Sequence, residues 1–276
     1  MTETQKQYLT RIVRWLGLLP LAERLRAEVM AWKNHRANRR FCASHHEDPL
    51  PPISLMHDPY GVVDYAGYWN SGKSSARALG EIINASHGGG DRTIKILEWG
   101  CGPARVIRHL SAAQSDRRYD LSGTDYNKKM ISWCQSSLPE INFSTNELAP
   151  PLGYPDSAFD FIYCLSVFTH LSEAMHHGWI KELLRVLKPG GCILLSLHGD
   201  FFRRKMLPDE LKQYDAGDLV VRTGFIEGGR MYTAFHGERF VREKLLGRCE
   251  ILRHDTSDNQ IAPPQDVWLM RKTTAE

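Results

Sequence analysis

The sequence predicts a doubly wound α/β fold with a seven-stranded, mostly parallel sheet and an antiparallel edge strand. Between residues 94 and 198, short apolar runs alternate with amphipathic stretches, which indicates parallel strands joined by helical crossovers. Two more apolar runs, at 249–255 and 267–271, are separated by a loop and predict the antiparallel edge. A helical extension precedes this core, and an insertion follows the fifth strand.

The composition is that of an ordinary globular chain. With 276 residues, 42% hydrophobic and 24% charged, it can bury a core of roughly 150 residues with additions at both ends. A net charge of +3 is too small to indicate nucleic-acid binding. The six cysteines show no zinc-like spacing, no signal peptide is recognised, and no apolar run reaches the roughly 18 residues of a membrane helix. We therefore expect a cytoplasmic protein with reduced thiols.

Residues 1–46 form the expected helical extension. Apolar residues recur at three- and four-residue steps from residue 2, and Pro20 is expected to split the segment into two helices. The segment carries nine Lys and Arg against three Glu, a net charge of +6. Two interpretations remain open: residues 2–40 contact the anionic inner membrane surface peripherally, or the extension packs on the core or on a second subunit with a solvated basic face.

Residues 47–92 connect the extension to the core, which we expect to occupy residues 93–276. Proline, histidine and acidic residues between His45 and Pro59 predict a linker, and a helix is expected at 74–86. The aromatic-rich segment Asp58–Trp69 either forms a lid over the acceptor or packs the N-terminal helix on the core.

The core elements follow in order. We expect strands at 94–98, 119–124, 141–145, 159–165 and 192–198, with helices at 105–113, 128–137 and 176–187. Residues 189–191 are expected to turn into the fifth strand. The insertion, residues 199–235, is glycine-punctuated and is expected to cover the active-site edge with a hairpin. A helix at 237–246 precedes the two closing strands.

The turn Glu98-Trp99-Gly100-Cys101-Gly102-Pro103-Ala104 ends the first strand. Glycine allows a tight turn and a close approach to a ligand, and a helix N-terminus offers unpaired N–H groups. A dinucleotide-binding turn would need glycine at position 105, which is Arg105, and does not ordinarily place an acid two residues before its first glycine. The turn therefore favours a nucleotide-like ligand over a nicotinamide cofactor.

Asp125 lies at the end of the second predicted strand, 23 residues after Gly102. A carboxylate in this place can accept hydrogen bonds from both hydroxyls of a ribose. The alternative is that Asp125 is the N-cap of the following helix.

With these residues in place, the chain resembles the class I S-adenosylmethionine-dependent methyltransferase family over about residues 94–198. The matching stretches are 96–110, 121–134, 155–171 and 183–195, and the family's two closing strands extend the resemblance to the C-terminus. Ala104 stands where many members have a third glycine.

The resemblance implies S-adenosylmethionine as cofactor, with contacts from residues that follow the first four strands. These residues are Glu98, Gly100, Cys101, Gly102, Asp125, Tyr126, Asn146, Glu147, Leu165 and Ser166. Glu98 would meet the amino group and Asp125 the ribose, with Tyr126 beside it. Residues 146–147 would lie at the adenine edge, and residues 165–166 at the methionine tail.

Because the sulfonium is already reactive, catalysis requires mainly positioning, plus a base if the acceptor is a hydroxyl. His198, at the end of the fifth strand, is the first candidate base, followed by His170 and His236, with Asp200 as a further option. No metal is expected. The histidine pairs at 45–46 and 176–177 lack a nearby acid cluster, and we expect these side chains to be solvated.

Sequence marks of nucleic-acid methylation are missing. Enzymes that methylate the amino group of adenine typically have Asn/Asp-Pro-Pro-Tyr/Phe after the fourth strand, whereas residues 165–168 of this chain are Leu-Ser-Val-Phe. Methylation of cytosine at C5 would need a nucleophilic cysteine after the same strand, whereas Cys164 is expected within it. We therefore expect a small-molecule, glycan or lipid-linked acceptor, methylated at oxygen. The alternative is a non-catalytic S-adenosylmethionine- or nucleotide-binding partner or scaffold. The oligomeric state stays open.

Overall fold

The computed structural model describes residues 19–88, 92–110, 118–247 and 249–273. The chain divides into two compact units, Met1–Tyr68 and Trp69–Glu276, which are described separately. In the described part of the chain, no helix is both long and apolar enough to cross a membrane.

The first unit contains α2 (Leu19–Ser44), α3 (Ile53–Tyr60) and the start of α4 (Tyr65–His87). Asn38 of α2 is buried and ties the chain before α4 to the helix, since its amide donates to Val63 O (2.9 Å) and accepts from Tyr65 N (3.0 Å). The first predicted helix lies outside the described residues, so the expected break at Pro20 stays a prediction.

The predicted linker is partly helical, which corrects the expectation for residues 45–59. α3 forms because Met56 is fully buried, and burial of an apolar side chain offsets the low helix preference of the surrounding proline and histidine. The helix ends at Gly61, whose φ of 64° is left-handed and whose N–H donates to His57 O (2.9 Å).

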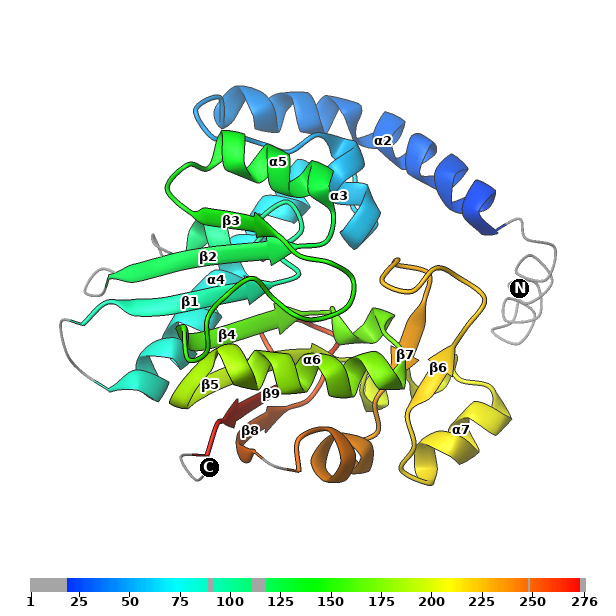
Figure 1. The fold of residues 1–276 in the computed structure, drawn as a ribbon. Coiled ribbons are helices and arrows are strands. Elements are labelled where there is room, and N and C mark those ends of the chain that lie inside the picture. The colour runs from blue at the N-terminus through cyan, green and yellow to red at the C-terminus, as the bar shows by residue number, and fades with distance from the viewer. Residues whose placement is uncertain (1–18, 89–91, 111–117, 248, 274–276) are drawn as a thin grey trace. The chain divides into compact units, whose positions relative to one another are not determined.

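The second unit contains the predicted sheet, with strand order β3-β2-β1-β4-β5-β9-β8 (Figure 1). Its strands are β1 (Ile94–Trp99), β2 (Tyr119–Asp125), β3 (Asn142–Thr145), β4 (Phe159–Leu165), β5 (Leu187–Leu197), β8 (Glu250–Asp255) and β9 (Asp266–Arg271). β1 to β5 are parallel, and β9 runs antiparallel between β5 and β8. The order reverses at β1, which pairs with both β2 and β4, and such a switch point leaves a crevice at the carboxyl ends of the strands.

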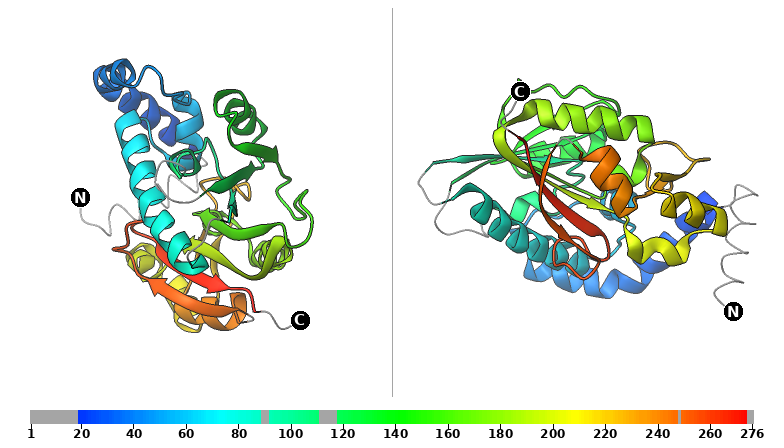
Figure 2. Two further views of the ribbon diagram at one scale, coloured as in Figure 1. Left: turned by 90° about the vertical axis from the view of Figure 1, so that its left-hand side faces the viewer. Right: turned by 90° about the horizontal axis from the view of Figure 1, so that it is seen from below.

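Successive side chains of a strand point to opposite faces of the sheet and pack against two different layers of helices. In β1, Ile94 and Ile96 pack with α4, α5 (Lys128–Ser137) and the short helix η1 (Ile107–His109). Leu97 and Trp99 pack with α6 (Glu173–Val186) and the π-helix η5 (Phe240–Leu245). Figure 2 shows α4 and α6 on opposite faces of the sheet. The doubly wound fold is thereby confirmed.

The helix expected at 105–113 is not present in its described part, where only the three-residue η1 forms. The cause is the backbone of the preceding turn: Gly100, Gly102 and Ala104 have φ values of 76°, 51° and 59°, so the chain is still turning where the helix was expected to begin. Residues 111–113 lie outside the described part.

The predicted turn at 189–191 also differs, because β5 already begins at Leu187. Pairing with β4 jumps from Phe159–Leu187 to Phe161–Cys192, so these residues form a bulge within the strand, with Gly190 at φ 74°. The predicted helix at 237–246 is largely the π-helix η5, in which Leu246 N donates to Val241 O (2.8 Å).

The insertion contains η4 (Asp200–Lys205), α7 (Pro208–Asp215) and the expected hairpin, formed by β6 (Val220–Arg222) and β7 (Thr233–Phe235). The two strands are antiparallel.

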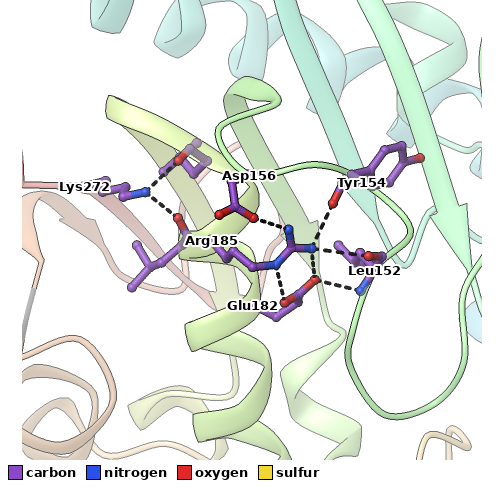
Figure 3. A network of polar contacts seen from close by, with 8 residues as sticks. Leu152, Tyr154, Asp156, Glu182, Arg185 and Lys272 are labelled. Atoms are coloured by element: carbon purple, nitrogen blue, oxygen red, sulfur yellow. Dashed lines mark hydrogen bonds and ion pairs between the residues drawn. The ribbon is translucent and has the colours of Figure 1, made fainter.

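Arg185 of α6 holds the loop between β3 and β4 (Figure 3). Its guanidinium donates to Glu182 Oε1 (2.6 Å), Asp156 Oδ1 (2.6 Å) and Tyr154 O (2.9 Å). Glu182 in turn accepts from Leu152 N (2.7 Å). Arg185 lies next to the end of α6, and the loop residues it contacts come just before β4. The network therefore fixes the entry into β4 at the amino edge of the sheet, opposite the carboxyl edge at which a cofactor is expected.

We expect Arg185→Ala to lower the free energy of unfolding by about 2 kcal/mol. The buried Glu182 carboxylate loses its cationic partner and keeps only the Leu152 N–H, and the carbonyls of Leu152 and Tyr154 lose their guanidinium donor. Hydrogen bonds from Arg185 lower the pKa of Glu182, so this contribution is complete above the ordinary Glu pKa and is lost as pH falls through the lowered value. Urea unfolding at pH 7 and at pH 3 measures both effects. Arg239→Ala, which breaks an exposed pair with Glu243, is the control and should cost under about 0.5 kcal/mol. Equal losses for the two variants would contradict the assigned role.

Candidate functional site

The glycine turn after β1 joins three strand ends. Gly100 N and Cys101 N both donate to Thr124 O at the end of β2 (2.7 and 3.1 Å). A Cβ atom at Gly100 would collide with Cγ2 of Val167, which lies just after β4. Since φ at Gly100 is 76°, the position requires glycine both for its backbone conformation and for the space.

Asp125 is buried at the carboxyl end of β2, beside this turn. Its Oδ2 accepts from Gly102 N (2.9 Å) and its Oδ1 from Asn127 N (2.8 Å). Asn127, whose side chain accepts from Lys129 N and Met130 N, is the N-cap of α5, so the N-cap interpretation of Asp125 is wrong. A carboxylate has about four acceptor positions, which leaves two on Asp125 for a ligand's hydroxyls. Burial raises the pKa of Asp125, while the two N–H donors oppose the rise.

Glu98 is buried at the end of β1, and its Oε2 accepts from Ile107 N (3.2 Å). Burial raises the pKa of Glu98 to about 8. An ammonium group placed beside this carboxyl would favour its charged form and reverse the shift. The chemistry of Glu98 and Asp125 thus fits a ligand that carries both an amino group and a diol, as S-adenosylmethionine does.

The other residues expected at the cofactor lie at the same edge. The side-chain amide oxygen of Asn146 accepts from Thr124 Oγ1 (2.9 Å), and the backbone N–H of Asn146 donates to Asp125 O (3.2 Å). Tyr126 is 45% exposed and its hydroxyl donates to Gly228 O in the insertion (3.1 Å). Glu147 is exposed, and residues 165–166 are half-buried at the end of β4.

His170 and His198 are both held by the insertion. The Nδ1 of His170 lies 2.7 Å from Tyr232 O, and that of His198 lies 3.1 Å from Ala234 O, two residues further along the same chain segment. Because a carbonyl can only accept, each Nδ1 carries the proton and each Nε2 keeps its lone pair. Burial lowers the pKa of both rings, that of His198 to about 3. At neutral pH both are neutral and able to accept a proton.

His236 is buried and pairs with His176 through their Nε2 atoms (2.8 Å). Since Nδ1 of His176 faces Ser172 O (2.7 Å), His176 is protonated there, and His236 must be the donor between the two rings. The remaining Nδ1 of His236 is buried with no hydrogen-bond partner. Burial lowers the pKa of both histidines.

The expectation of solvated histidines is wrong for His176, which is fully buried. Its spacing from Ile180 and Leu183 places it on the apolar side of α6, a signal already present in the sequence. His177 and His46 are exposed. Within the described ranges, no group of three His, Cys, Asp or Glu side chains could hold a metal ion.

The insertion reaches this edge from several positions. Besides the histidine contacts, Gly228 N donates to His170 O (2.9 Å) and Ser172 N donates to Glu227 Oε1 (2.5 Å). Asp200 begins η4 and accepts from the Tyr214 hydroxyl (2.9 Å). The edge therefore has buried acids on one side and neutral histidines under the insertion on the other.

Comparison with known proteins identifies the core. Residues 96–191 match a family described as "Methyltransferase domain". The chain is similar to the methyltransferase YqeM of Bacillus subtilis, at 27% identity over 120 residues, which is 42% of this chain and 47% of that protein. It is also similar to 2-methyl-6-phytyl-1,4-hydroquinone methyltransferase of Synechocystis, at 26% identity over 104 residues, 37% of this chain and 31% of that protein. The matches span less than half the length of these curated relatives.

The fold has a solved counterpart in magnesium protoporphyrin IX methyltransferase from Synechocystis with bound S-adenosylhomocysteine. The TM-score is 0.52 at 18% identity, covering 80% of this chain and 92% of that one. The family match covers most of β1, the glycine turn, Asp125 and the whole of β2, β3 and β4, and it ends within β5. Residues 96–191 are therefore a methyltransferase domain, and the sheet built on them has the class I S-adenosylmethionine-dependent methyltransferase fold.

Proposed function

We propose that this protein transfers the methyl group of S-adenosylmethionine to an acceptor held between the carboxyl edge of the sheet and the insertion, residues 199–235. The observation that supports this most directly is the pairing of two kinds of group at one edge. Buried Glu98 and Asp125 adjoin the glycine turn, and the neutral rings of His170 and His198 lie under the insertion.

The cofactor supplies an electrophilic methyl group on a sulfonium. Asp125 would accept from its ribose hydroxyls, and Glu98 would hold its amino group, while the backbone of residues 100–102 allows close approach. Residues 146–147 would border the adenine and residues 165–166 the methionine tail. These residues bind and orient the donor, and this accounts for most of the catalytic requirement.

His198 is our first choice for the base that removes the acceptor's hydroxyl proton. Its ring is half-buried, is fixed by Ala234 O and presents an Nε2 lone pair. His170, held in the same manner, is the second choice. His236 ranks below both, because its free Nδ1 is buried away from the surface.

We propose a small-molecule, glycan or lipid-linked acceptor, methylated at oxygen. The Synechocystis relative is named for a phytyl hydroquinone, a small lipid-like molecule, and this supports the class of acceptor. The choice of oxygen rests on the neutral histidines at the edge. In this chain, Phe202 and Phe235 flank the His198 ring, with ring centroids 4.1 and 5.7 Å away. Both phenylalanines are buried, so they hold the His198 ring in place and offer no face of their own to the acceptor. The lid proposed for Asp58–Trp69 stays a prediction, although Trp69 itself packs edge-on against His109 at 4.5 Å.

The first test is calorimetric titration with S-adenosylmethionine and S-adenosylhomocysteine, for which we expect binding of both. Asp125→Ala should weaken binding by about 1–3 kcal/mol, because the ribose hydroxyls lose their acceptor. The matched control is Asp120→Ala at the opposite end of the same strand, which should leave the dissociation constant unchanged. If wild-type protein binds neither ligand, the proposed function fails.

The second test concerns the base. We expect His198→Gln to reduce release of S-adenosylhomocysteine about 10²-fold with an accepted phenol, sugar or polyprenyl hydroxyl, with little effect on cofactor affinity. His177→Gln, at an exposed histidine, is the control. Cofactor binding without turnover across such acceptors would instead favour a non-catalytic binding protein.

The pH dependence follows from the lowered pKa of His198, about 3. The ring must be neutral to act as a base, so its contribution should persist as pH falls through 6.5, where an ordinary histidine becomes protonated. NMR titration of the His198 ring should accordingly show no protonation between pH 8 and pH 5. A midpoint near 6.5 would contradict the buried, carbonyl-bound geometry.

We also propose that α2 contacts an anionic membrane surface. Leu25, Val29 and Trp32 follow one another at helical spacing and are 55%, 52% and 79% exposed. Between residues 25 and 44, five Lys and Arg stand against one Glu. An exposed apolar stripe on a basic helix is typical of interfacial binding.

Co-sedimentation with phosphatidylglycerol-containing vesicles tests this contact. Trp32→Glu should reduce the bound fraction several-fold, because it places a charge in the apolar stripe. Ala37→Glu adds the same charge at an exposed position on another side of α2 and should have a smaller effect. Equal binding to neutral and anionic vesicles would contradict the proposal.

A further inference from the structure

Gln265, at the end of the loop between β8 and β9, connects the ends of β4 and β5. Its side chain is nine-tenths buried. Ser196 Oγ of β5 donates to its Oε1 (2.7 Å), and its Nε2 donates to Ser166 Oγ just after β4 (2.5 Å). Ser166 N donates back to Ser196 Oγ (2.8 Å). The three residues thus close a ring of hydrogen bonds across three strands.

The ring holds Ser166 in an unfavourable backbone conformation. Its φ of 65° is left-handed, which for a residue other than glycine costs on the order of 1–3 kcal/mol and persists only where surrounding contacts enforce it. Thr169 Oγ1 adds a hydrogen bond to Ser166 O (2.5 Å). The next residue, Val167, is the one that would collide with a Cβ atom at Gly100. The conformation of Ser166 therefore determines how closely the loop after β4 approaches the glycine turn.

Gln265 is itself held in place by its own loop. Its N–H donates to Ala262 O (2.8 Å), and its carbonyl accepts from the Asn259 amide (2.6 Å). The loop is fastened to α4, because Ser75 Oγ donates to Ile261 O (2.7 Å). A buried amide anchored in this way can act as a fixed support for Ser166.

We infer that Gln265 is a positioning residue for the methionine end of the cofactor, acting through Ser166 and Val167 without touching the cofactor itself. The inference rests on the proposed function, since it takes residues 165–166 to border the methionine tail. It extends the cofactor site to the C-terminal hairpin, which lies outside the segment matched by the methyltransferase family.

The test uses two ligands that differ only at that end. S-adenosylhomocysteine carries the amino-acid portion, whereas 5′-methylthioadenosine keeps the adenosine and sulfur without it. We expect Gln265→Met, which keeps the side-chain volume but removes the hydrogen bonds, to weaken S-adenosylhomocysteine binding about tenfold and 5′-methylthioadenosine binding less than twofold. Gln265→Asn, whose shorter amide cannot span both serines, should behave in the same way and serves if the Met variant folds poorly.

The matched control is Gln213→Met, since Gln213 also supports a loop through its amide, donating to Leu219 O (2.7 Å) in the insertion. It should change neither dissociation constant. A second measurement introduces Ser166→Gly, because glycine adopts the left-handed conformation without strain. In that background, Gln265→Met should weaken S-adenosylhomocysteine binding less than threefold.

The outcomes separate the two proposals. If wild-type protein does not bind S-adenosylhomocysteine, both the proposed cofactor site and this inference are contradicted. If wild-type protein binds and the Gln265 variants bind equally well, only the role of Gln265 is overturned. The role of Gln265 is also overturned if the affinities for both ligands fall equally, which would indicate a general structural role. It is likewise overturned if the full tenfold loss of S-adenosylhomocysteine affinity persists in the Ser166→Gly background.

Discussion

The glycine turn at the carboxyl end of β1 is the constraint on which the rest of the site depends. It lies where the strand order reverses, so the ends of β1, β2 and β4 converge there, and its backbone donates to β2 while contacting the residue after β4. A side chain at Gly100 would separate these ends. The absence of a side chain therefore keeps Glu98, Asp125 and the β4 loop close together at this edge.

Burial governs the protonation of nearly every titratable group around this turn. It raises the pKa of Glu98 and Asp125 and lowers that of His170 and His198. The two kinds of shift have different uses. In the proposed function, the acids bind a cationic amino group and a diol, whereas the histidines remain neutral and so can accept a proton. The insertion also determines which nitrogen of each histidine ring can accept a proton, because its carbonyls bind Nδ1 and leave the lone pair on Nε2.

Segments distant in sequence support this arrangement from outside. The insertion holds the two histidines. Gln265 holds Ser166 from the C-terminal hairpin. Each support ends on a polar atom that would otherwise be buried and unpaired, which makes the geometry of the edge expensive to distort.

The sequence alone determined the sheet, since alternating apolar runs and helical crossovers permit few other arrangements, and it identified the glycine turn because only glycine tolerates the close approach needed at Gly100. Local pattern could not determine the supports. The ring of Gln265, Ser166 and Ser196 joins residues up to 99 positions apart. The buried pairing of His176 with His236 spans 60 positions and overturned an expectation of solvation. Such contacts are decided by how strands and the insertion pack, because hydrogen-bond partners across a sheet edge carry no periodicity along the chain.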